Sequence, residues 1–181
     1  MRFTKIIKSE KGFSLIELMV VLVIMVALTM LVLAGYSETG PRLAAERAVE
    51  SFIGDIYKAR SRNIGAHSQI DNEEILTFNH GVYLESGDES YIIFADKNEN
   101  KEYSTGEDVE TVDVERGASI LEIEVGGTPE TSVSVVFSEK GEEVFFNGQA
   151  NSSASISFGY GSIQRTVEIN SSGIVSVIQD F

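Results

Sequence analysis

The densest group of side chains that could do chemistry lies in one short acidic stretch, residues 96–107. Oxygen-bearing side chains recur there at alternate positions and again at its end: Asp96, Asn98, Asn100, Glu102 and Glu107. These are positions 1, 3, 5, 7 and 12 of the kind of loop that wraps hard oxygen ligands around one Ca²⁺. The spacing therefore makes calcium a candidate cofactor of this stretch.

Two features of the same stretch weaken the calcium prediction. Lys101 stands where such loops need glycine for a sharp turn, and it adds a positive charge beside the ligands. The residues before Asp96 read as a strand, so the stretch is not an EF-hand between two helices. An acidic, solvated turn explains the same residues, because Asp-x-Asn-x-Asn is also favourable turn chemistry. The sequence leaves both interpretations open.

Catalytic chemistry has little support elsewhere in the chain. There is no cysteine, and the two histidines, His67 and His80, lie in no metal-ligand or nucleophile–base spacing. The many glutamates make chance carboxylate pairs inevitable, so no acid/base dyad is assigned. We therefore expect that the protein is not an enzyme.

Glu17 is the most informative residue near the N-terminus. It lies in an almost purely apolar run from Phe13 to Ala34, and a carboxylate in a membrane helix costs about 2.5–3.5 kcal/mol at the bilayer centre. A cut after Gly12 would create an α-amine at Phe13, one helical turn from the Glu17 carboxylate. The alternative is that Glu17 reaches the headgroups from its place near the helix start.

The segment Lys11–Glu17, after a short basic leader and before an unbroken apolar run, resembles the processing site of type IV prepilins and type II secretion pseudopilins. The resemblance implies that a membrane aspartic peptidase cleaves between Gly12 and Phe13 and methylates the new amine of Phe13. It also implies that Glu17 registers each subunit on the N-terminus of its neighbour during assembly.

The same resemblance implies the partners and the location. The partners would be the prepilin peptidase, other pilin or pseudopilin subunits and an inner-membrane assembly platform. The chain would cross the bacterial cytoplasmic membrane once, with its C-terminal domain outside the cytoplasm, before it enters a pilus or pseudopilus filament.

The arrangement of the helix end at 55–61 and the final strand pair around 165–177 is most similar to that of the type H pseudopilin and its related minor pilin. Major pilins usually close their C-terminal region with a disulfide, which this chain cannot form.

Three segments must position these residues. Residues 1–12 form a basic leader of net charge +3, which the positive-inside rule keeps in the cytoplasm. Residues 13–64 are predicted to form a long helix that spans the membrane to about residue 35. The 22 residues from Phe13 to Ala34 give about 33 Å of helix, which is enough to cross a bilayer core of about 30 Å. We expect a break from Gly35 to Pro41 that kinks or briefly unwinds the helix. After it, one apolar stripe follows helical spacing: Ala45, Val49, Phe52, Ile56 and Ala59. Gly65 is expected to end the helix.

Residues 65–181 form the third segment, a β-rich soluble domain, because the hydrophobic period changes to two. The predicted strands are Ile75–Phe78, Gly81–Glu85, Tyr91–Ala95, Val109–Val114, Ser119–Val125, Val133–Phe137, Val144–Phe146, Ser155–Phe158, Ile163–Ile169 and Ile174–Ile178. Asn170–Gly173 is predicted to join the last two strands as a hairpin. The fold class is therefore α+β: a long N-terminal hydrophobic helix, membrane-spanning and then amphipathic, packed on an antiparallel β-sandwich or sheet domain.

The charge of the soluble domain bears on its partners. From residue 63 onward there are 5 Lys/Arg against 22 Asp/Glu, a net charge of −17. Such a surface repels nucleic acid, and Arg165 is the single arginine near the C-terminus where related minor pilins bind DNA. We expect a structural filament subunit that does not bind nucleic acid. The alternatives are a filament-tip binding module (an adhesin or a DNA-uptake minor pilin) and a membrane-tethered protein that never assembles.

Overall fold

The computed structural model describes residues 13–64, 68–71, 74–115, 117–138, 141, 143–150 and 152–178. The chain divides into two compact units, residues 1–39 and 40–181, which are considered separately below. The helical residues 40–64 therefore belong to the same compact unit as the sheets.

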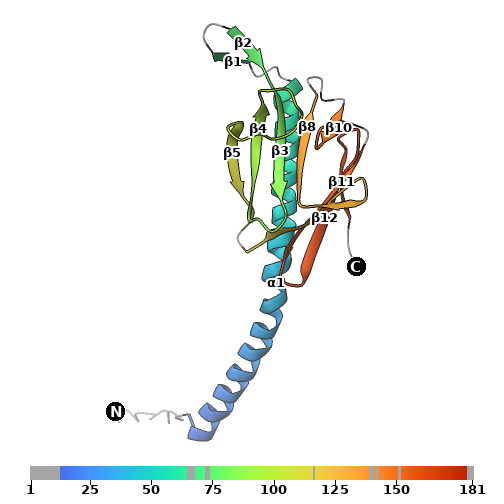
Figure 1. The fold of residues 1–181 in the computed structure, drawn as a ribbon. Coiled ribbons are helices and arrows are strands. Elements are labelled where there is room, and N and C mark those ends of the chain that lie inside the picture. The colour runs from blue at the N-terminus through green and yellow to red at the C-terminus, as the bar shows by residue number, and fades with distance from the viewer. Residues whose placement is uncertain are drawn as a thin grey trace, which may run out of the picture. The chain divides into compact units, whose positions relative to one another are not determined.

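A single helix, α1, runs from Leu15 to Ile64 (Figure 1). Its first half is built from apolar residues, and its second half alternates apolar and charged residues at helical spacing. The helix continues without interruption across Pro41, so the predicted break from Gly35 to Pro41 does not unwind it, and a kink there stays a prediction. Proline removes one backbone donor from the helix, and the hydrogen bonds of the adjoining turns do not depend on that donor.

The second unit contains two large antiparallel sheets and a small one (Figure 1). The six-stranded sheet has the order β10-β9-β8-β3-β4-β5, formed by Gln149–Ala150, Val144–Phe146, Ser132–Phe137, Asn79–Glu85, Ser90–Asp96 and Asp108–Asp113. The five-stranded sheet has the order β13-β12-β11-β6-β7, formed by Val175–Ile178, Ile163–Ile169, Ala154–Tyr160, Ser119–Val125 and Thr128–Glu130. The strands β1 (Ser68–Asp71) and β2 (Glu74–Thr77) pair with each other.

The predicted fold class is confirmed: every strand pairing is antiparallel, and the helix packs on the sheets. Each predicted strand corresponds to an observed one, whereas the short strands β1, β7 and β10 were not predicted. The hairpin at Asn170–Gly173 is also confirmed. The side-chain oxygen of Asn170 accepts hydrogen bonds from the backbone N–H groups of Ser172 and Ile174, and Gly173 has a φ of 71°.

The core of this unit lies where the helix meets the inner faces of both large sheets. The predicted apolar stripe of the helix is confirmed, because all its members are buried: Ala45, Val49, Phe52, Ile56 and Ala59. Phe52 contacts both sheets. Its ring lies 5.5 Å from that of Tyr91 on β4 and 5.0 Å from that of Phe158 on β11. The helix therefore joins the two sheets through one shared hydrophobic core.

A buried polar contact fixes the end of the helix between two strands. The Asn63 side-chain amide donates to the backbone carbonyls of His80 on β3 and Phe137 on β8, at 3.2 and 2.9 Å. The Asn63 carbonyl oxygen accepts the backbone N–H of His80 at 2.7 Å. Buried polar groups need such partners, so this residue ties the last helical turn to the six-stranded sheet.

Candidate functional site

The beginning of α1 is the first candidate site. The backbone carbonyl of Ser14 accepts hydrogen bonds from the N–H groups of Glu17 and Leu18, at 3.0 and 3.2 Å. Ser14 is thus the residue that precedes the first helical turn, and Glu17 lies at its third position. A carboxylate there interacts favourably with the helix dipole, and Ser-x-x-Glu is the sequence of a capping box. This local role of Glu17 was not inferred from the sequence, although the Ser-x-x-Glu spacing was available as a signal.

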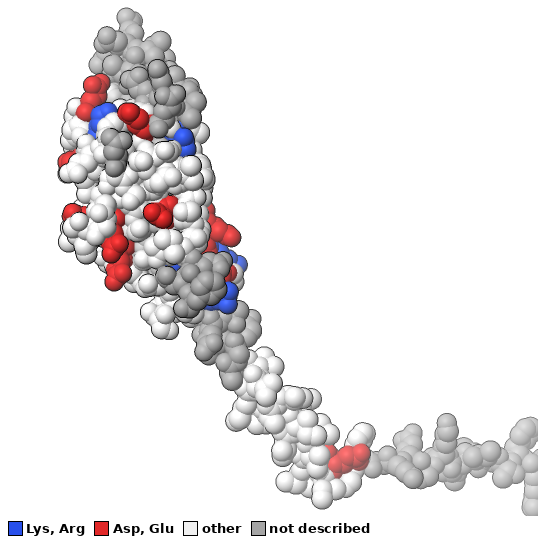
Figure 2. Space-filling model, turned by 90° about the vertical axis from the view of Figure 1, so that its right-hand side faces the viewer, with Lys and Arg blue, Asp and Glu red and all other residues white. Residues whose placement is uncertain are grey.

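The helical segment that follows is an exposed apolar surface. Leu15–Leu33 is long and apolar enough to cross a bilayer, with a mean hydropathy of 2.9. Its large hydrophobic side chains are between 47% and 78% exposed. Figure 2 shows this segment as uncharged apart from acidic atoms at its beginning, since Glu17 is the only charged residue from 13 to 33. Such a surface requires lipid or protein around it.

The acidic stretch 96–107 is the second candidate site, and it forms the loop between β4 and β5. The Asp96 carboxylate is fully buried and accepts the backbone N–H groups of Asn100 and Lys101, at 3.1 and 3.0 Å. The Glu107 carboxylate is 4% exposed and accepts the N–H groups of Lys97, Asn98 and Ser104, at 2.9, 3.3 and 2.8 Å. Both carboxylates therefore organise the loop from inside.

The remaining predicted ligands lie on the outside of this loop. Asn98, Asn100 and Glu102 are exposed. The side-chain oxygen of Asn98 accepts the N–H of Asn100, and that of Asn100 accepts the N–H of Glu102, at 3.1 and 2.9 Å. These are successive Asx turns.

Lys101 occupies the position where the calcium pattern needs glycine. It adopts a φ of 63°, so the backbone takes the left-handed turn without glycine. Its ammonium lies 3.9 Å from the centre of the Phe145 ring, which is cation–π geometry. Among the described residues, no group of three or more His, Cys, Asp or Glu side chains could hold a metal ion. Side-chain oxygens of four predicted ligands, Asp96, Asn98, Asn100 and Glu107, already accept backbone N–H groups, and calcium at this loop stays a prediction.

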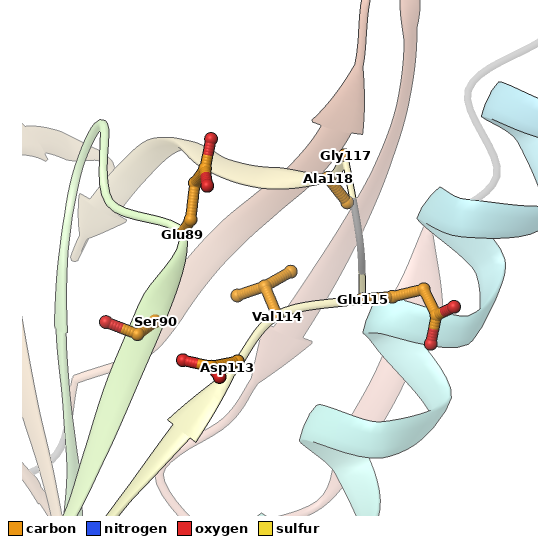
Figure 3. Close-up of a pocket in the computed structure, with 7 residues that line it drawn as sticks. All are labelled: Glu89, Ser90, Asp113, Val114, Glu115, Gly117 and Ala118. Carbon is orange, nitrogen blue, oxygen red and sulfur yellow. The ribbon is translucent and has the colours of Figure 1, made fainter.

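An open pocket lies where β4 begins and β5 ends (Figure 3). It is lined by Glu89, Ser90, Asp113, Val114, Glu115, Gly117 and Ala118. Figure 3 shows the Glu115 side chain directed toward the helix, where Arg47 lies 3.6 Å from its carboxylate. The remaining lining groups are acidic or small, and none forms a nucleophile–base arrangement.

Arg165 was considered as the residue that could contact DNA. The structure places it on β12, with its guanidinium 3.5 Å from the Glu46 carboxylate on the helix and 3.2 Å from the carbonyl of Gln164. Its side chain is only 17% exposed. Arg165 therefore joins the five-stranded sheet to the helix, as a structural charge would.

One family model matches the chain. Residues 7–33 match the prokaryotic N-terminal methylation motif, which includes Gly12, Phe13 and Glu17. The chain carries the N-methylation motif of type IV pilin-like prepilins. Neither the comparison with curated proteins nor that with solved structures gives a match.

The prepilin motif implies processing by prepilin peptidase and assembly with other pilins. Gly12 lies outside the described residues, so cleavage between Gly12 and Phe13, methylation of Phe13 and registration by Glu17 stay predictions. The narrower similarity to the type H pseudopilin stays a prediction as well.

The buried carboxylate of the loop gives a testable pH dependence. Burial, together with the nearby charge of Glu107, raises the pKa of Asp96 above its ordinary value, although hydrogen bonds from the loop backbone oppose the rise. The folded protein therefore holds the Asp96 proton more tightly than the unfolded chain does. The stabilisation from Asp96 is complete below its ordinary pKa and is lost as the pH rises through the folded pKa. We expect the Tm of Asp96→Asn, minus that of the wild type, to increase from about pH 3 to pH 7.

The measurement is thermal melting of residues 40–181 as a function of pH. Arg42 and Lys58 lower the pKa values of Glu46 and Glu110, so these two carboxylates make the stability change with pH in the opposite direction. Their contributions cancel in the difference between the Tm of the variant and that of the wild type. A Tm difference that is flat or decreases with pH would contradict the raised pKa of Asp96.

Repeating the melts with calcium, and with magnesium as control, tests whether the loop binds a cation. A rise in Tm with calcium alone would support the predicted ligands.

Proposed function

We propose that this protein is a structural subunit, a minor pilin or pseudopilin, of a type IV pilus or a type II secretion pseudopilus. Prepilin peptidase would cleave between Gly12 and Phe13 and methylate Phe13, and the mature chain would assemble through α1. The observation that carries the proposal is the methylation motif at 7–33, which leads into an exposed apolar helix whose only charge is at its start.

Physical chemistry supports assembly as the role of this helix. In the membrane the exposed side chains of Leu15–Leu33 contact lipid. Outside the membrane the same area must be covered by other protein, and neighbouring helices of the same kind provide such a cover. A carboxylate at the start of each helix and a free amine on its neighbour would then compensate each other.

A structural role for the β-domain agrees with its electrostatics. Arg165 is paired with Glu46, and the domain carries many more acidic than basic residues. Phosphate contacts need several cations on one face. The described residues therefore do not favour a DNA-uptake role.

N-terminal mass analysis of the protein from native membranes tests the proposal. We expect a mature chain that begins with N-methyl-Phe13 and is 12 residues shorter than the precursor. The Gly12→Val variant serves as the control, since a larger side chain beside the scissile bond should leave the precursor uncut. A wild-type chain that retains Met1 in a working filament would refute the proposal.

A further inference from the structure

The two large sheets end in four edge strands, and three of these are protected against pairing with another strand. β5 carries acidic side chains at Asp108, Glu110 and Asp113, β10 has only two residues, and β7 has three with a proline in the middle. Charge, shortness and proline are the usual means by which proteins keep sheet edges from pairing. The fourth edge strand, β13, has four residues and neither charge nor proline.

The free edge of β13 is apolar and exposed. Ile174, directly before the strand, is 60% exposed, and Val177 and Ile178 within it are 44% and 41% exposed. Valine and isoleucine are strong strand formers, and an exposed edge of this composition favours the addition of a further strand. The described strands of the chain do not supply one, since β13 lies at the end of its sheet.

The hydrogen bonds of the β12–β13 hairpin show which backbone groups face this free edge. The Asn170 N–H donates to the Ile174 carbonyl at 3.1 Å, in continuation of the antiparallel register of β12 and β13. Hydrogen-bonded and non-hydrogen-bonded pairs alternate along an antiparallel ladder, so Ser176 also bonds toward β12. The backbone N–H and C=O groups of Val175 and Val177 therefore face away from β12, toward the free edge.

The sequence of this edge is self-complementary. Residues 174–178 read Ile-Val-Ser-Val-Ile, which is the same in both directions. If two copies pair antiparallel with Ser176 opposite itself, Ile174 lies opposite Ile178 of the second copy, and Val175 lies opposite Val177. Cross-strand pairs of β-branched side chains stabilise a sheet. In the same register the outward backbone groups of Val175 and Val177 meet and can exchange both hydrogen bonds.

The acidity of the domain does not prevent this pairing. Residues 174–178 carry no charge, and the acidic residue beside the centre of the strand is Glu168, opposite Ser176 on β12. In the paired sheet the Glu168 residues of the two copies would be three strand spacings apart, about 14 Å. This distance exceeds the Debye length of about 8 Å at physiological ionic strength, so their repulsion is largely screened.

We propose that the β13 edge is an interface at which two copies of this chain pair antiparallel, centred on Ser176, so that their five-stranded sheets form one continuous sheet. A two-fold axis relates the copies, and both contribute the same surface. Because the large sheets of each copy offer one such edge among their described strands, the assembly closes at a dimer. The inference goes beyond the proposed function, since the interface lies on the β-domain and does not require cleavage after Gly12.

Single-cysteine cross-linking of the full-length chain in native membranes tests the proposal, because the wild type contains no cysteine. Ser176→Cys would lie opposite itself in a non-hydrogen-bonded pair, with Cα atoms about 4.5 Å apart, which is within the range of disulfides. Ile174→Cys is the register control. Ile174 lies on the same edge, but its Cα atoms in the two copies would be about 14 Å apart, too far for a disulfide.

With copper phenanthroline as oxidant, we expect the disulfide-linked homodimer to be at least about tenfold more abundant for Ser176→Cys than for Ile174→Cys. Thr128→Cys, exposed on the protected edge strand β7, should cross-link as little as Ile174→Cys. Adding Val177→Lys to Ser176→Cys should reduce the dimer about tenfold, because it places a charge on the edge, whereas Val177→Thr should retain it. Both substitutions at this exposed position should leave the Tm of the chain in detergent unchanged.

Three results would overturn the inference: no homodimer with Ser176→Cys, equal cross-linking at positions 176, 174 and 128, or adducts of Ser176→Cys with other proteins alone. The same cross-linking in the Gly12→Val precursor separates this inference from the proposed function. We expect the uncut precursor to form the homodimer as well as the processed chain does. Loss of cleavage or of filament entry would then refute the proposed function while the dimer remains.

Discussion

Replacing Glu17 by alanine is expected to leave membrane insertion and cleavage intact and to reduce filament incorporation by roughly a hundredfold. Removal of the carboxylate from an apolar segment makes insertion easier. In the proposed assembly, however, the methylated amine of Phe13 would lose its counter-charge among apolar helices. Breaking one partner out of a buried ion pair costs about 3–5 kcal/mol, since the other charge remains uncompensated.

The measurement is the ratio of processed subunit in sheared filaments to processed subunit in membranes. Thr29→Ala is the matched control, because Thr29 is the other polar residue inside the apolar segment and its hydroxyl already donates to the Met25 carbonyl at 2.7 Å. We expect the control to incorporate like the wild type. Normal incorporation of Glu17→Ala would leave only the local role of Glu17 at the helix start, as a first-turn carboxylate after Ser14.

The sequence predicted well those parts of the fold that depend on local periodicity. The helical stripe around Phe52 and the period-two strands are properties of consecutive residues, so their type follows from a short window. The short strands β7 and β10 were missed because two or three residues carry no periodic signal, and they form only when a neighbouring strand offers a partner. At Pro41, local propensity likewise predicts a break, whereas the helix continues through this residue without unwinding.

The candidate sites divide in the same way, into features that a local sequence pattern reveals and features that only the fold reveals. The methylation motif is a contiguous pattern, and a family model matches residues 7–33, the range that contains the residues singled out from the sequence. The contact of Arg165 with Glu46 joins residues 119 positions apart, so only the fold reveals it. In the acidic loop, the spacing singled out Asp96 and Glu107 among the oxygen-bearing residues. It could not tell whether their oxygens face a cation or the backbone of their own loop, since both uses need the same residues.

Replacing Phe52 by alanine is expected to lower the free energy of unfolding of residues 40–181 by about 3–5 kcal/mol. The side chain is fully buried and is in ring contact with Tyr91 on one sheet and Phe158 on the other. Its loss removes apolar transfer energy and leaves a cavity that neither sheet can fill by moving alone, because both are tied to the helix by Asn63 and Arg165. For a unit of this size the change corresponds to a decrease of about 10–15 °C in Tm.

Urea unfolding followed by circular dichroism measures this change, with Tyr57→Ala as the matched control. Tyr57 is an aromatic residue of the same helix on the exposed side, so its loss should cost less than about 1 kcal/mol in the isolated unit. Similar costs for the two variants would mean that α1 does not sit between the sheets as described. A large cost for Phe52 alone would show that the helix is the element that holds the two sheets together. The same helix would then carry the stability of the domain through its later turns and the contacts proposed for assembly through Leu15–Leu33.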